Sequence, residues 1–236
     1  MDLTNKTICI TGANGGVGAA TLSYALKHNA KKIYALARDS ASLEALAARH
    51  PSIAALQLDI TDAAQVANVA ATLEPLDLLI NTAGVNSGAR IFDATQSDFD
   101  VNVFGTLNVY KAFTPKMKTE GAIVTVTSIL ACMNLPIMGL YCASKSALRS
   151  LTQALRAEVA SKNIEVYEVL AGPIETKMTE GQEMPKSKPE AIVAAIFEGI
   201  EQKSFEIYPD DFSKMIREGL ARDPREVELN FAASLG

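Results

Sequence analysis

The 236-residue sequence predicts an α/β fold, a doubly wound parallel sheet of about seven strands with helices on both faces. Short apolar runs alternate with segments of helical periodicity along most of the chain, which is typical of repeated strand–helix–strand units. Crossovers between parallel strands are right-handed, so this order favours a Rossmann-like sheet. No linker, internal repeat or low-complexity segment divides the chain, and its length suits one large domain, so we expect residues 1–236 to form a single domain.

The elements follow one another along the chain as apolar runs and helical patterns. The predicted strands are short and apolar or rich in β-branched residues, and they are Thr7–Thr11, Lys32–Ala37, Ala54–Leu58, Leu76–Ile80, Gly121–Thr127, Glu165–Leu170 and Phe205–Tyr208. The predicted helices between them are Val17–His28, Ser40–Arg49, Asp62–Leu73, Phe99–Met117, Cys142–Ser161 and Pro189–Gln202. We expect Ser40 and Asp62 to cap their helices. No role is predicted for the tail, which is polar after Asp223 and ends in Leu229–Gly236.

Composition excludes several classes of function. The net charge of −5 argues against a nucleic-acid surface, which needs a basic patch. Cys9, Cys132 and Cys142 form no Cys-x-x-Cys pair, so neither a disulfide framework nor a metal site is expected, and a cytoplasmic location is the simplest interpretation. No apolar run reaches the length of a membrane span, so no membrane partner is expected.

A glycine-rich turn follows the first strand and opens the first helix. It reads Thr11-Gly-Ala-Asn-Gly-Gly-Val-Gly18, with the spacing Gly12, Gly16 and Gly18. Glycines let a backbone turn tightly and approach a pyrophosphate, and the helix N-terminus offers N–H groups to the anion. The turn could also be a tight strand–helix connection without a ligand. Its place at the first crossover favours a dinucleotide cofactor.

From Thr7 to about Thr176 the sequence resembles the short-chain dehydrogenase/reductase family. The glycine turn, Asn81-Thr82-Ala83-Gly84 after the fourth predicted strand, Tyr141-x-x-x-Lys145 and Gly172-Pro173-Ile174-x-Thr176 all match in order. The resemblance implies a catalytic set of Asn102, Ser128, Tyr141 and Lys145. It also implies cofactor contacts from Gly12, Asn14, Gly15, Gly16, Val17, Gly18, Arg38, Asp59, Ile60, Asn81, Ala83, Gly84, Tyr141, Lys145, Pro173, Ile174 and Thr176. Thr82 and Ala171 depart from the family pattern, which usually has asparagine and proline there.

The catalytic residue types suit carbonyl reduction, which needs a hydride from the cofactor and a proton from the protein. Tyr141 and Lys145 are four positions apart on one helix face, where an ammonium group can lower the pKa of a phenol. We expect Ser128 to polarise the substrate oxygen. By resemblance, Lys145 also binds the nicotinamide ribose and Asn102 holds a water that relays protons. Taken singly, each residue could equally be an ordinary structural one.

The cofactor is predicted to be NADP(H). Ala37 stands where an NAD-selecting acid would end the second strand, and Arg38 follows it. A guanidinium can bind a 2′-phosphate with charge-assisted hydrogen bonds. The alternative is that Asp39 reaches the ribose and selects NAD, although Asp39 could instead cap the next helix or pair with Arg38.

The predicted function is therefore NADPH-dependent, reversible reduction of a ketone or aldehyde to an alcohol. The alternatives are an NAD-dependent alcohol dehydrogenase on the same site and a nucleotide-sensing regulator without catalysis. Residues expected near the small-molecule substrate are mostly apolar: Ile129, Leu130, Asn134, Leu135, Met138 and Met178. We expect residues 178–188 to form a short loop over the substrate. Apolar residues on more than one face of Phe99–Met117 and Cys142–Ser161 predict a homodimer or homotetramer.

Overall fold

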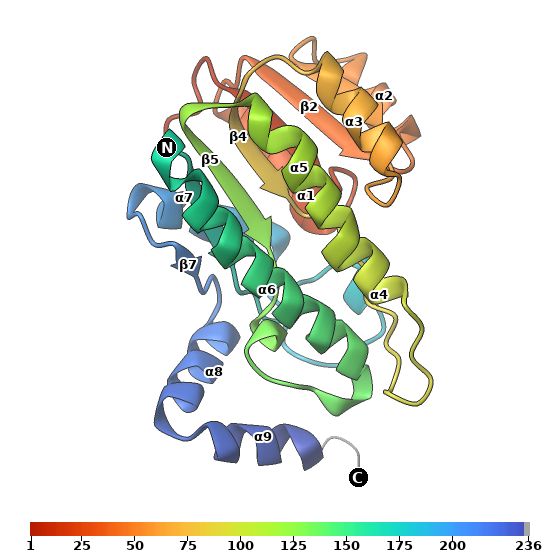
Figure 1. Cartoon of the computed structure of the whole chain (residues 1–236), viewed down its shortest axis with the longest axis vertical. Coiled ribbons are helices and arrows are strands. Elements are labelled where there is room, and N and C mark those ends of the chain that lie inside the picture. The colour runs from red at the N-terminus through yellow and green to blue at the C-terminus, as the bar shows by residue number, and fades with distance from the viewer. Residues whose placement is uncertain (234–236) are drawn as a thin grey trace.

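The computed structural model describes residues 1–233 and confirms the doubly wound parallel sheet (Figure 1). Seven parallel strands lie in the order β3-β2-β1-β4-β5-β6-β7. They are β1 Thr7–Thr11, β2 Lys32–Ala37, β3 Ile53–Gln57, β4 Leu76–Asn81, β5 Met117–Val126, β6 Glu165–Val169 and β7 Glu206–Ile207. The order reverses between β1 and β4, and open α/β sheets bind ligands at the carboxyl ends of the strands beside such a switch point.

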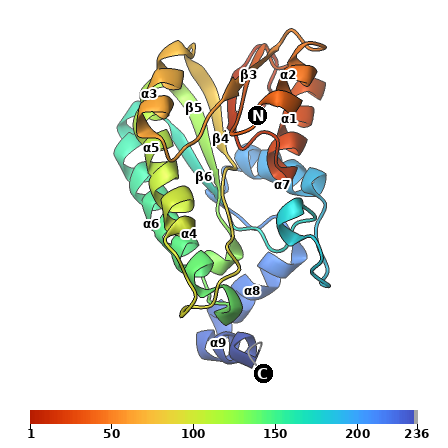
Figure 2. The same cartoon turned by 90° about the vertical axis from the view of Figure 1, so that its right-hand side faces the viewer.

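Two layers of helices cover the sheet (Figure 2). One layer consists of α1 Gly16–Lys27, α2 Ala41–Ala47 and α7 Pro189–Glu201, and the other of α3 Ala63–Thr72, α5 Thr106–Phe113 and α6 Gly139–Val159. Neighbouring residues of β1 point to opposite layers, so that Ile10 packs in the first core and Cys9 in the second. Burial on both faces explains why the central strands are continuous apolar runs.

The helix predicted over Phe99–Met117 is interrupted. It consists of α4 Ser97–Phe99, a π-helical stretch over Asp100–Gly105, α5, and a 3₁₀ turn over Thr114–Lys116. The π-helical stretch contains Asn102, and such widened turns are frequent at functional sites. The helical path ends at the turn containing Pro115, and β5 begins at Met117, four residues before the predicted strand.

One predicted helix cap is confirmed and the other is wrong. The Asp62 carboxylate accepts hydrogen bonds from the amides of Ala64 and Gln65 at the start of α3. The Ser40 hydroxyl instead donates to the Glu44 carboxylate at 2.6 Å. The amide of Ala41 donates to Asp39 at 3.1 Å, so the acid before Ser40 satisfies the start of α2.

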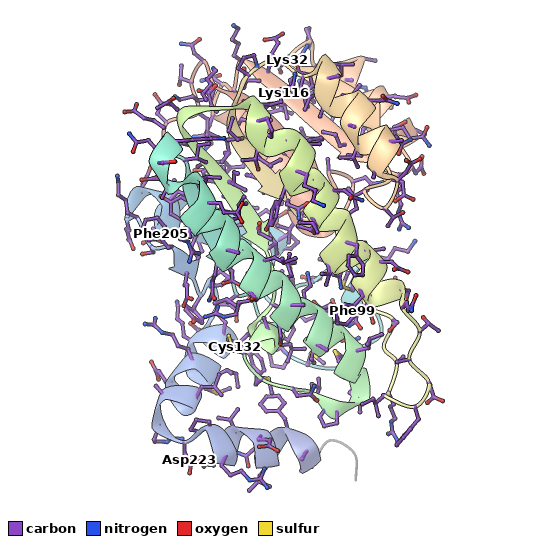
Figure 3. All side chains as sticks on the ribbon, viewed as in Figure 1. Lys32, Phe99, Lys116, Cys132, Phe205 and Asp223 are labelled. Carbon is purple, nitrogen blue, oxygen red and sulfur yellow. The ribbon has the colours of Figure 1, made fainter. Side chains whose placement is uncertain are left out.

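Two further helices were not predicted: α8 Asp211–Arg222 and α9 Pro224–Ala232. Asp210 and Asp223 cap their N-termini through side-chain carboxylates. The pair packs with Ile129 and Ala131 on the loop after β5, and Cys132 marks this junction in Figure 3. The predicted tail Leu229–Gly236 is thus helical through Ala232, and residues 234–236 lie outside the described part of the chain.

Within residues 1–233, no helix combines the length and apolar character that crossing a membrane requires.

Candidate functional site

The glycine turn between β1 and α1 leaves no room for a side chain at Gly12, Gly16 or Gly18. Gly12 has φ +68°, and a Cβ there would lie 2.8 Å from the amide nitrogen of Ala83 after β4. A Cβ on Gly16 would collide with the Thr176 side chain, and one on Gly18 with the Gly12 carbonyl. The residue before α1 has no side-chain cap. The first amides of a 12-residue helix therefore face a cradle shaped for an anion, which suits a pyrophosphate.

The end of β2 carries Arg38 and Asp39 beside this turn. Arg38 is exposed, and its backbone carbonyl accepts a hydrogen bond from Gln57. Asp39 is held at both ends, since its carbonyl accepts from Asn14 at 3.0 Å and its carboxylate accepts from the amide of Ala41. The capping alternative for Asp39 thus has direct geometric support.

Asp59 lies near Arg38 at the end of the neighbouring strand. Hydrogen bonds from the amide and hydroxyl of Thr61, at 2.9 and 2.7 Å, lower the pKa of the Asp59 carboxyl, and the charge of Arg38 adds to this effect. The amide of Asp59 donates to Gln65. Asp59 is therefore ionised at neutral pH, with its acceptor oxygens fixed beside the turn.

The segment after β4 is tied to β1. Asn81 is bonded to the Thr11 hydroxyl and donates to Thr106 at 3.1 Å. The hydroxyl of Thr82 donates to the Thr11 carbonyl at 2.7 Å. Thr82, one of the two departures from the family pattern, thus holds the glycine turn against β4 by its side chain.

The four predicted catalytic residues converge at the carboxyl ends of β4 and β5. Lys145 and Tyr141 share a face of α6, with the Lys145 amine 5.7 Å from the centre of the Tyr141 ring. The amine donates to the Val126 carbonyl at 3.3 Å, two residues before Ser128. A Cβ on Gly84 would lie 3.4 Å from the Lys145 amine and 3.1 Å from the Asn102 amide oxygen. The close approach at Gly84 shows that β4, the π-helical stretch and α6 meet at one point.

The Ser128 hydroxyl is positioned by backbone groups. It accepts a hydrogen bond from the amide of Leu130 at 3.1 Å and lies 3.4 Å from the Ala171 carbonyl. It is also close enough to the Tyr141 phenol to lower that group's pKa in part. Ser128 and Tyr141 can thus both hydrogen-bond to the same substrate oxygen.

Asn102 is fully buried, and its amide has three protein partners. Its oxygen accepts from the Val85 amide at 2.8 Å, while its nitrogen donates to the Val85 carbonyl at 2.9 Å and to the Ser144 hydroxyl at 3.0 Å. Both N–H donors are used, and one lone pair on the oxygen is left for a water. Asn102 therefore fastens the segment after β4 to α6.

Burial sets the protonation states of Tyr141 and Lys145 on α6. It raises the pKa of Tyr141 to about 12, which the Ser128 hydroxyl opposes only in part. It lowers the pKa of Lys145 to about 8, opposed by the negative charges of Asp98 and Glu168. The lowering of the Tyr141 pKa expected from Lys145 is not found: burial raises this pKa, and the Ser128 hydroxyl is the group that lowers it. At neutral pH the phenol is protonated, which is the form that can donate a proton.

The segment after β6 is anchored to α8 and closes on itself. The Gly172 amide donates to the Asp210 carboxylate at 2.8 Å. Glu175 and Ser187 are joined by a 2.9 Å backbone hydrogen bond at the neck of the following loop. The predicted substrate loop at residues 178–188 leaves this neck, and its side chains Met178 and Met184 are exposed.

Sequence reasoning missed three buried carboxylates around the site: Asp98, Glu168 and Asp210. Asp98 accepts hydrogen bonds from the amide and the hydroxyl of Ser87. Glu168 has a signal in the sequence, since it is an acid within the strand pattern Val-Tyr-Glu-Val, whereas Asp98 and Asp210 lie outside the apolar runs and have none. One prediction about the surroundings is wrong, because Ile129 is buried against α8 rather than turned toward a substrate.

Comparisons with known proteins find several dehydrogenases among the relatives of this chain. The chain is 29% identical, over 93% of its length and 88% of the relative's, to an NADP-dependent 3-hydroxy acid dehydrogenase of Schizosaccharomyces pombe. It is 30% identical to human dehydrogenase/reductase SDR family member 7 over 76% of this chain, and it spans 58% of that protein's length. A crystal structure of a short chain dehydrogenase from Burkholderia cenocepacia in complex with NADP superposes with a TM-score of 0.91 at 35% identity, covering 98% and 99% of the two chains.

The family model for short chain dehydrogenases matches residues 6–186, which contain the glycine turn, the Tyr141–Lys145 pair and the anchored segment after β6. The chain therefore belongs to the short-chain dehydrogenase family.

Proposed function

We propose that the protein is an NADP-dependent oxidoreductase that reduces a ketone or aldehyde to an alcohol, reversibly, with Tyr141 as the proton donor. The observation that carries the proposal is the convergence of Ser128, Tyr141 and Lys145 at the strand ends beside a glycine cradle. A regulator that only senses nucleotides has no need of this catalytic set.

The residues at the strand ends fit a nicotinamide dinucleotide. The turn from Gly12 to Gly18 would hold the pyrophosphate, Asp59 and Ile60 the adenine, and Asn81, Ala83 and Gly84 the adjoining ribose. Lys145 and Tyr141 would hold the nicotinamide ribose, with Pro173, Ile174 and Thr176 beside the ring. When bound, the cofactor supplies the hydride that carbonyl reduction requires.

The chain supplies the proton and the geometry. Ser128 donates a hydrogen bond to the carbonyl oxygen and so stabilises the charge that develops on it. Tyr141 donates its phenolic proton to the same oxygen, and the Lys145 ammonium stabilises the phenolate that remains. The free oxygen lone pair of Asn102 holds a water through which the proton is replaced.

The choice of NADP rests on the end of β2. Arg38 is exposed there, while one carboxylate oxygen of Asp39 accepts a hydrogen bond from the Ala41 amide at the start of α2. A guanidinium at that place favours a 2′-phosphate. The fission-yeast relative is an NADP-dependent dehydrogenase and the Burkholderia cenocepacia structure is a complex with NADP, and both support the same choice.

The substrate side is lined by apolar side chains in this proposal. Leu130, Leu135 and Met138 are partly exposed, and Met178 stands at the base of the loop at residues 178–188, which would cover a bound substrate. The described cysteines are all free thiols, which supports a reducing, cytoplasmic location.

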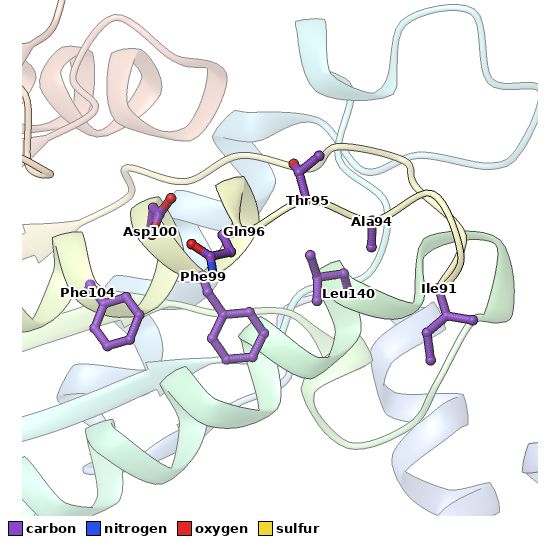
Figure 4. A pocket seen from close by; sticks show the side chains of 8 residues that line it. All are labelled: Ile91, Ala94, Thr95, Gln96, Phe99, Asp100, Phe104 and Leu140. Carbon is purple, nitrogen blue, oxygen red and sulfur yellow. The ribbon is translucent and has the colours of Figure 1, made fainter.

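We also propose that the protein is a homo-oligomer, with a smaller contact surface than the two apolar helices predicted. Val109, Phe113 and Leu155 are buried within the chain itself, against the sheet. Phe104 stays 56% exposed beside a pocket of about 510 Å³ (Figure 4). The pocket is lined by Ile91, Ala94, Thr95, Gln96, Phe99, Asp100, Phe104 and Leu140. We assign this surface to a second copy, as a homodimer or as one contact of a homotetramer.

The test is the loss of NADPH absorbance with a panel of aldehydes and ketones of increasing apolar size, repeated with NADH. We expect turnover with NADPH and weak turnover with NADH. Equal or better oxidation of alcohols with NAD would favour the NAD-dependent dehydrogenase instead. Tight NADPH binding by calorimetry with no turnover on the whole panel would favour the non-catalytic regulator.

A further inference from the structure

A cluster of charged residues, with the buried Glu168 at its centre, joins β6 and β7 to α6 and to the end of β5. Glu168 on β6 has no exposed surface, and its two carboxylate oxygens accept from the Thr127 hydroxyl and from the Arg149 guanidinium, both at 2.9 Å. The second guanidinium nitrogen of Arg149 donates to Glu206 on β7 at 2.7 Å. The bonds are charge-assisted, and every oxygen of the buried carboxylate has a partner.

The two partners of Glu168 are neighbours of the catalytic set in sequence. Thr127 directly precedes Ser128 at the end of β5, and Arg149 follows Lys145 by one turn of α6. The bond from Lys145 to the Val126 carbonyl joins the same helix to the same strand end. Glu168 therefore provides a second link between α6, which carries Tyr141 and Lys145, and the end of β5, which Ser128 follows.

The charges of the cluster do not cancel. Glu168 and Glu206 are acids and Arg149 is the base that joins them, so the three ion-paired groups carry one net negative charge. Burial raises the pKa of the Glu168 carboxyl, while the charge of Arg149, the hydrogen bond from Thr127 and the charge of Arg156 lower it.

Besides Glu168, Asp98 from α4 acts on the Lys145 amine. The neighbouring Tyr141 phenol is influenced by Asp98 and by Cys142 of α6. Burial works against the ammonium form of Lys145, and Asp98 and Glu168 are the groups that work for it.

Stability does not account for such a cluster. Removing charges from water is costly, and a buried ion pair replaced by apolar residues of similar volume is often as stable or more stable. Apolar side chains fill most of the other buried positions of this sheet. A buried acid at this place therefore points to a requirement of the site.

We propose that Glu168, acting through Arg149 and Thr127, is a positioning residue for the catalytic set: it holds α6 in register with the end of β5 and supplies the negative charge that keeps the Lys145 amine protonated. The proposal rests on the proposed function for its catalytic meaning, although its electrostatic part concerns the protein alone.

The test is a titration of Lys145 in the whole protein. The ¹³Cε resonance of Lys145 in ¹³C-lysine-labelled protein is assigned by its loss in Lys145→Ala and followed against pH. In Glu168→Gln, which keeps the size of the side chain but removes its charge, we expect the titration to move to lower pH by roughly half a unit. An unchanged titration would overturn the electrostatic part of the proposal.

Two further variants separate charge from structure. Glu165→Gln makes the same substitution at the opposite end of β6, where Glu165 pairs with Lys203, and we expect it to leave the Lys145 titration unchanged. The triple variant Glu168→Leu, Arg149→Met and Glu206→Gln removes all three ion-paired groups, and with them their net negative charge, without leaving a charge unpaired, and it serves if Glu168→Gln folds poorly. We expect it to fold and still to show the downward shift, and a wild-type titration there would contradict the role assigned to Glu168.

The kinetic arm is read separately. In carbonyl reduction, we expect Glu168→Gln to lower kcat by about tenfold with little change in the KM for NADPH, and to move the alkaline limb of the pH profile down in parallel with the Lys145 titration. If kcat falls while the alkaline limb of the pH profile stays at the wild-type pH, the role of Glu168 is merely structural. If the wild-type protein turns over no carbonyl compound, the proposed function fails, while the titration still decides the inference.

Discussion

At the residue scale, the site depends on a phenol and an amine that are both taken out of water. Burial pushes their pKa values in opposite directions, to about 12 for Tyr141 and about 8 for Lys145. Both shifts favour the neutral form of the group. Tyr141 is therefore held as an acid, and the protonation of Lys145 changes within the range in which the protein can be assayed.

The first prediction concerns the proton donor. Tyr141→Phe removes one hydroxyl from a buried ring, and we expect kcat for carbonyl reduction to fall by at least about 10²-fold because proton transfer from a positioned acid contributes that much or more. Binding of NADPH, measured by fluorescence, should persist. Tyr24→Phe, on α1 in the opposite layer, is the matched control and should keep full activity. Retention of most activity in Tyr141→Phe would contradict the mechanism.

The second prediction concerns stability and pH. Burial lowers the pKa of Lys145 from 10.5 to about 8, so between these values the unfolded chain binds more protons than the folded protein. The cost of burying this charge is therefore fully present below pH 8 and is relieved as pH rises toward 10.5. At pH 7 we expect Lys145→Met to be inactive but more stable in urea unfolding, by on the order of 1–3 kcal/mol.

The gain in Lys145→Met should shrink when the unfolding is repeated near pH 10. Lys27→Met, at an exposed position in the last turn of α1, should show no gain at either pH. A Lys145→Met protein that is less stable than wild type at pH 7 would show that the hydrogen bond to Val126 outweighs the burial of the charge.

The third prediction concerns the cofactor. Arg38→Ala removes the exposed guanidinium at the end of β2, and we expect the KM for NADPH to rise by on the order of a hundredfold, because each hydrogen bond to a charged group contributes roughly 1.5–3 kcal/mol. The KM for NADH should stay as in wild type. Arg49→Ala, an exposed arginine after α2, is the control for general charge effects. An unchanged NADPH KM in Arg38→Ala would refute this assignment.

At the scale of elements, α8 is attached to the segment after β6 that contains Gly172. The carboxylate of Asp210 caps α8 through the Ser213 amide and binds the Gly172 amide, both at 2.8 Å. A Cβ on Gly172 would lie 2.6 Å from that carboxylate, so only glycine allows this approach. Ala171 stands where the family usually has proline, and the bond from Asp210 restrains the same turn by another means.

The fourth prediction separates the two tasks of Asp210. We expect Asp210→Ala to lower the free energy of unfolding by about 1 kcal/mol, because α8 loses its cap. We also expect it to raise the KM for NADPH, because the segment before Thr176 is no longer anchored. Asp223→Ala removes an equivalent cap, that of α9, without touching Gly172. We expect it to lose similar stability and to leave the KM unchanged. Equal KM values in the two variants would show that the Gly172 anchor does not matter for the cofactor.

At the scale of the whole molecule, the parallel sheet collects groups from distant parts of the chain at one edge. The glycine turn follows β1, Asn81 ends β4, Ser128 follows β5 and Gly172 follows β6. The strand register places these ends together, and the two helix layers exclude water from the sheet on either side. The apolar surface left outside this arrangement includes the pocket beside Phe104.

The fifth prediction concerns assembly. With a chain mass of 25.1 kDa, light scattering at micromolar concentration should return a dimer or tetramer mass. Phe104→Asp should shift the mass toward the monomer, because a charge would be buried at the contact without a partner. Leu229→Asp, at an equally exposed apolar position on α9, is the control and should leave the mass unchanged. A monomer mass for the wild type would refute the proposed dimer.

Much of the fold follows from local pattern. The runs of β-branched and apolar residues predicted all seven strands, and helical spacing predicted the main helices of both layers. The helices α8 and α9 escaped prediction because their burial is slight, with Ser213, Ile216 and Val227 as their buried residues. The π-helical stretch around Asn102 has no periodicity that differs from an α-helix over so few residues.

The candidate site was likewise predictable only in part. Sequence patterns predict the glycine turn, the Tyr141–Lys145 pair and the order of the strand ends, because these depend on residue type and short spacing. The folded chain is needed to show that Glu168 joins Thr127 to Arg149, that Asp210 anchors Gly172 and that Asn102 joins α6 to the segment after β4. Such contacts join residues that are far apart in the chain, and burial, which sets both their strength and the pKa values of the site, arises only when the sheet and its helices have packed.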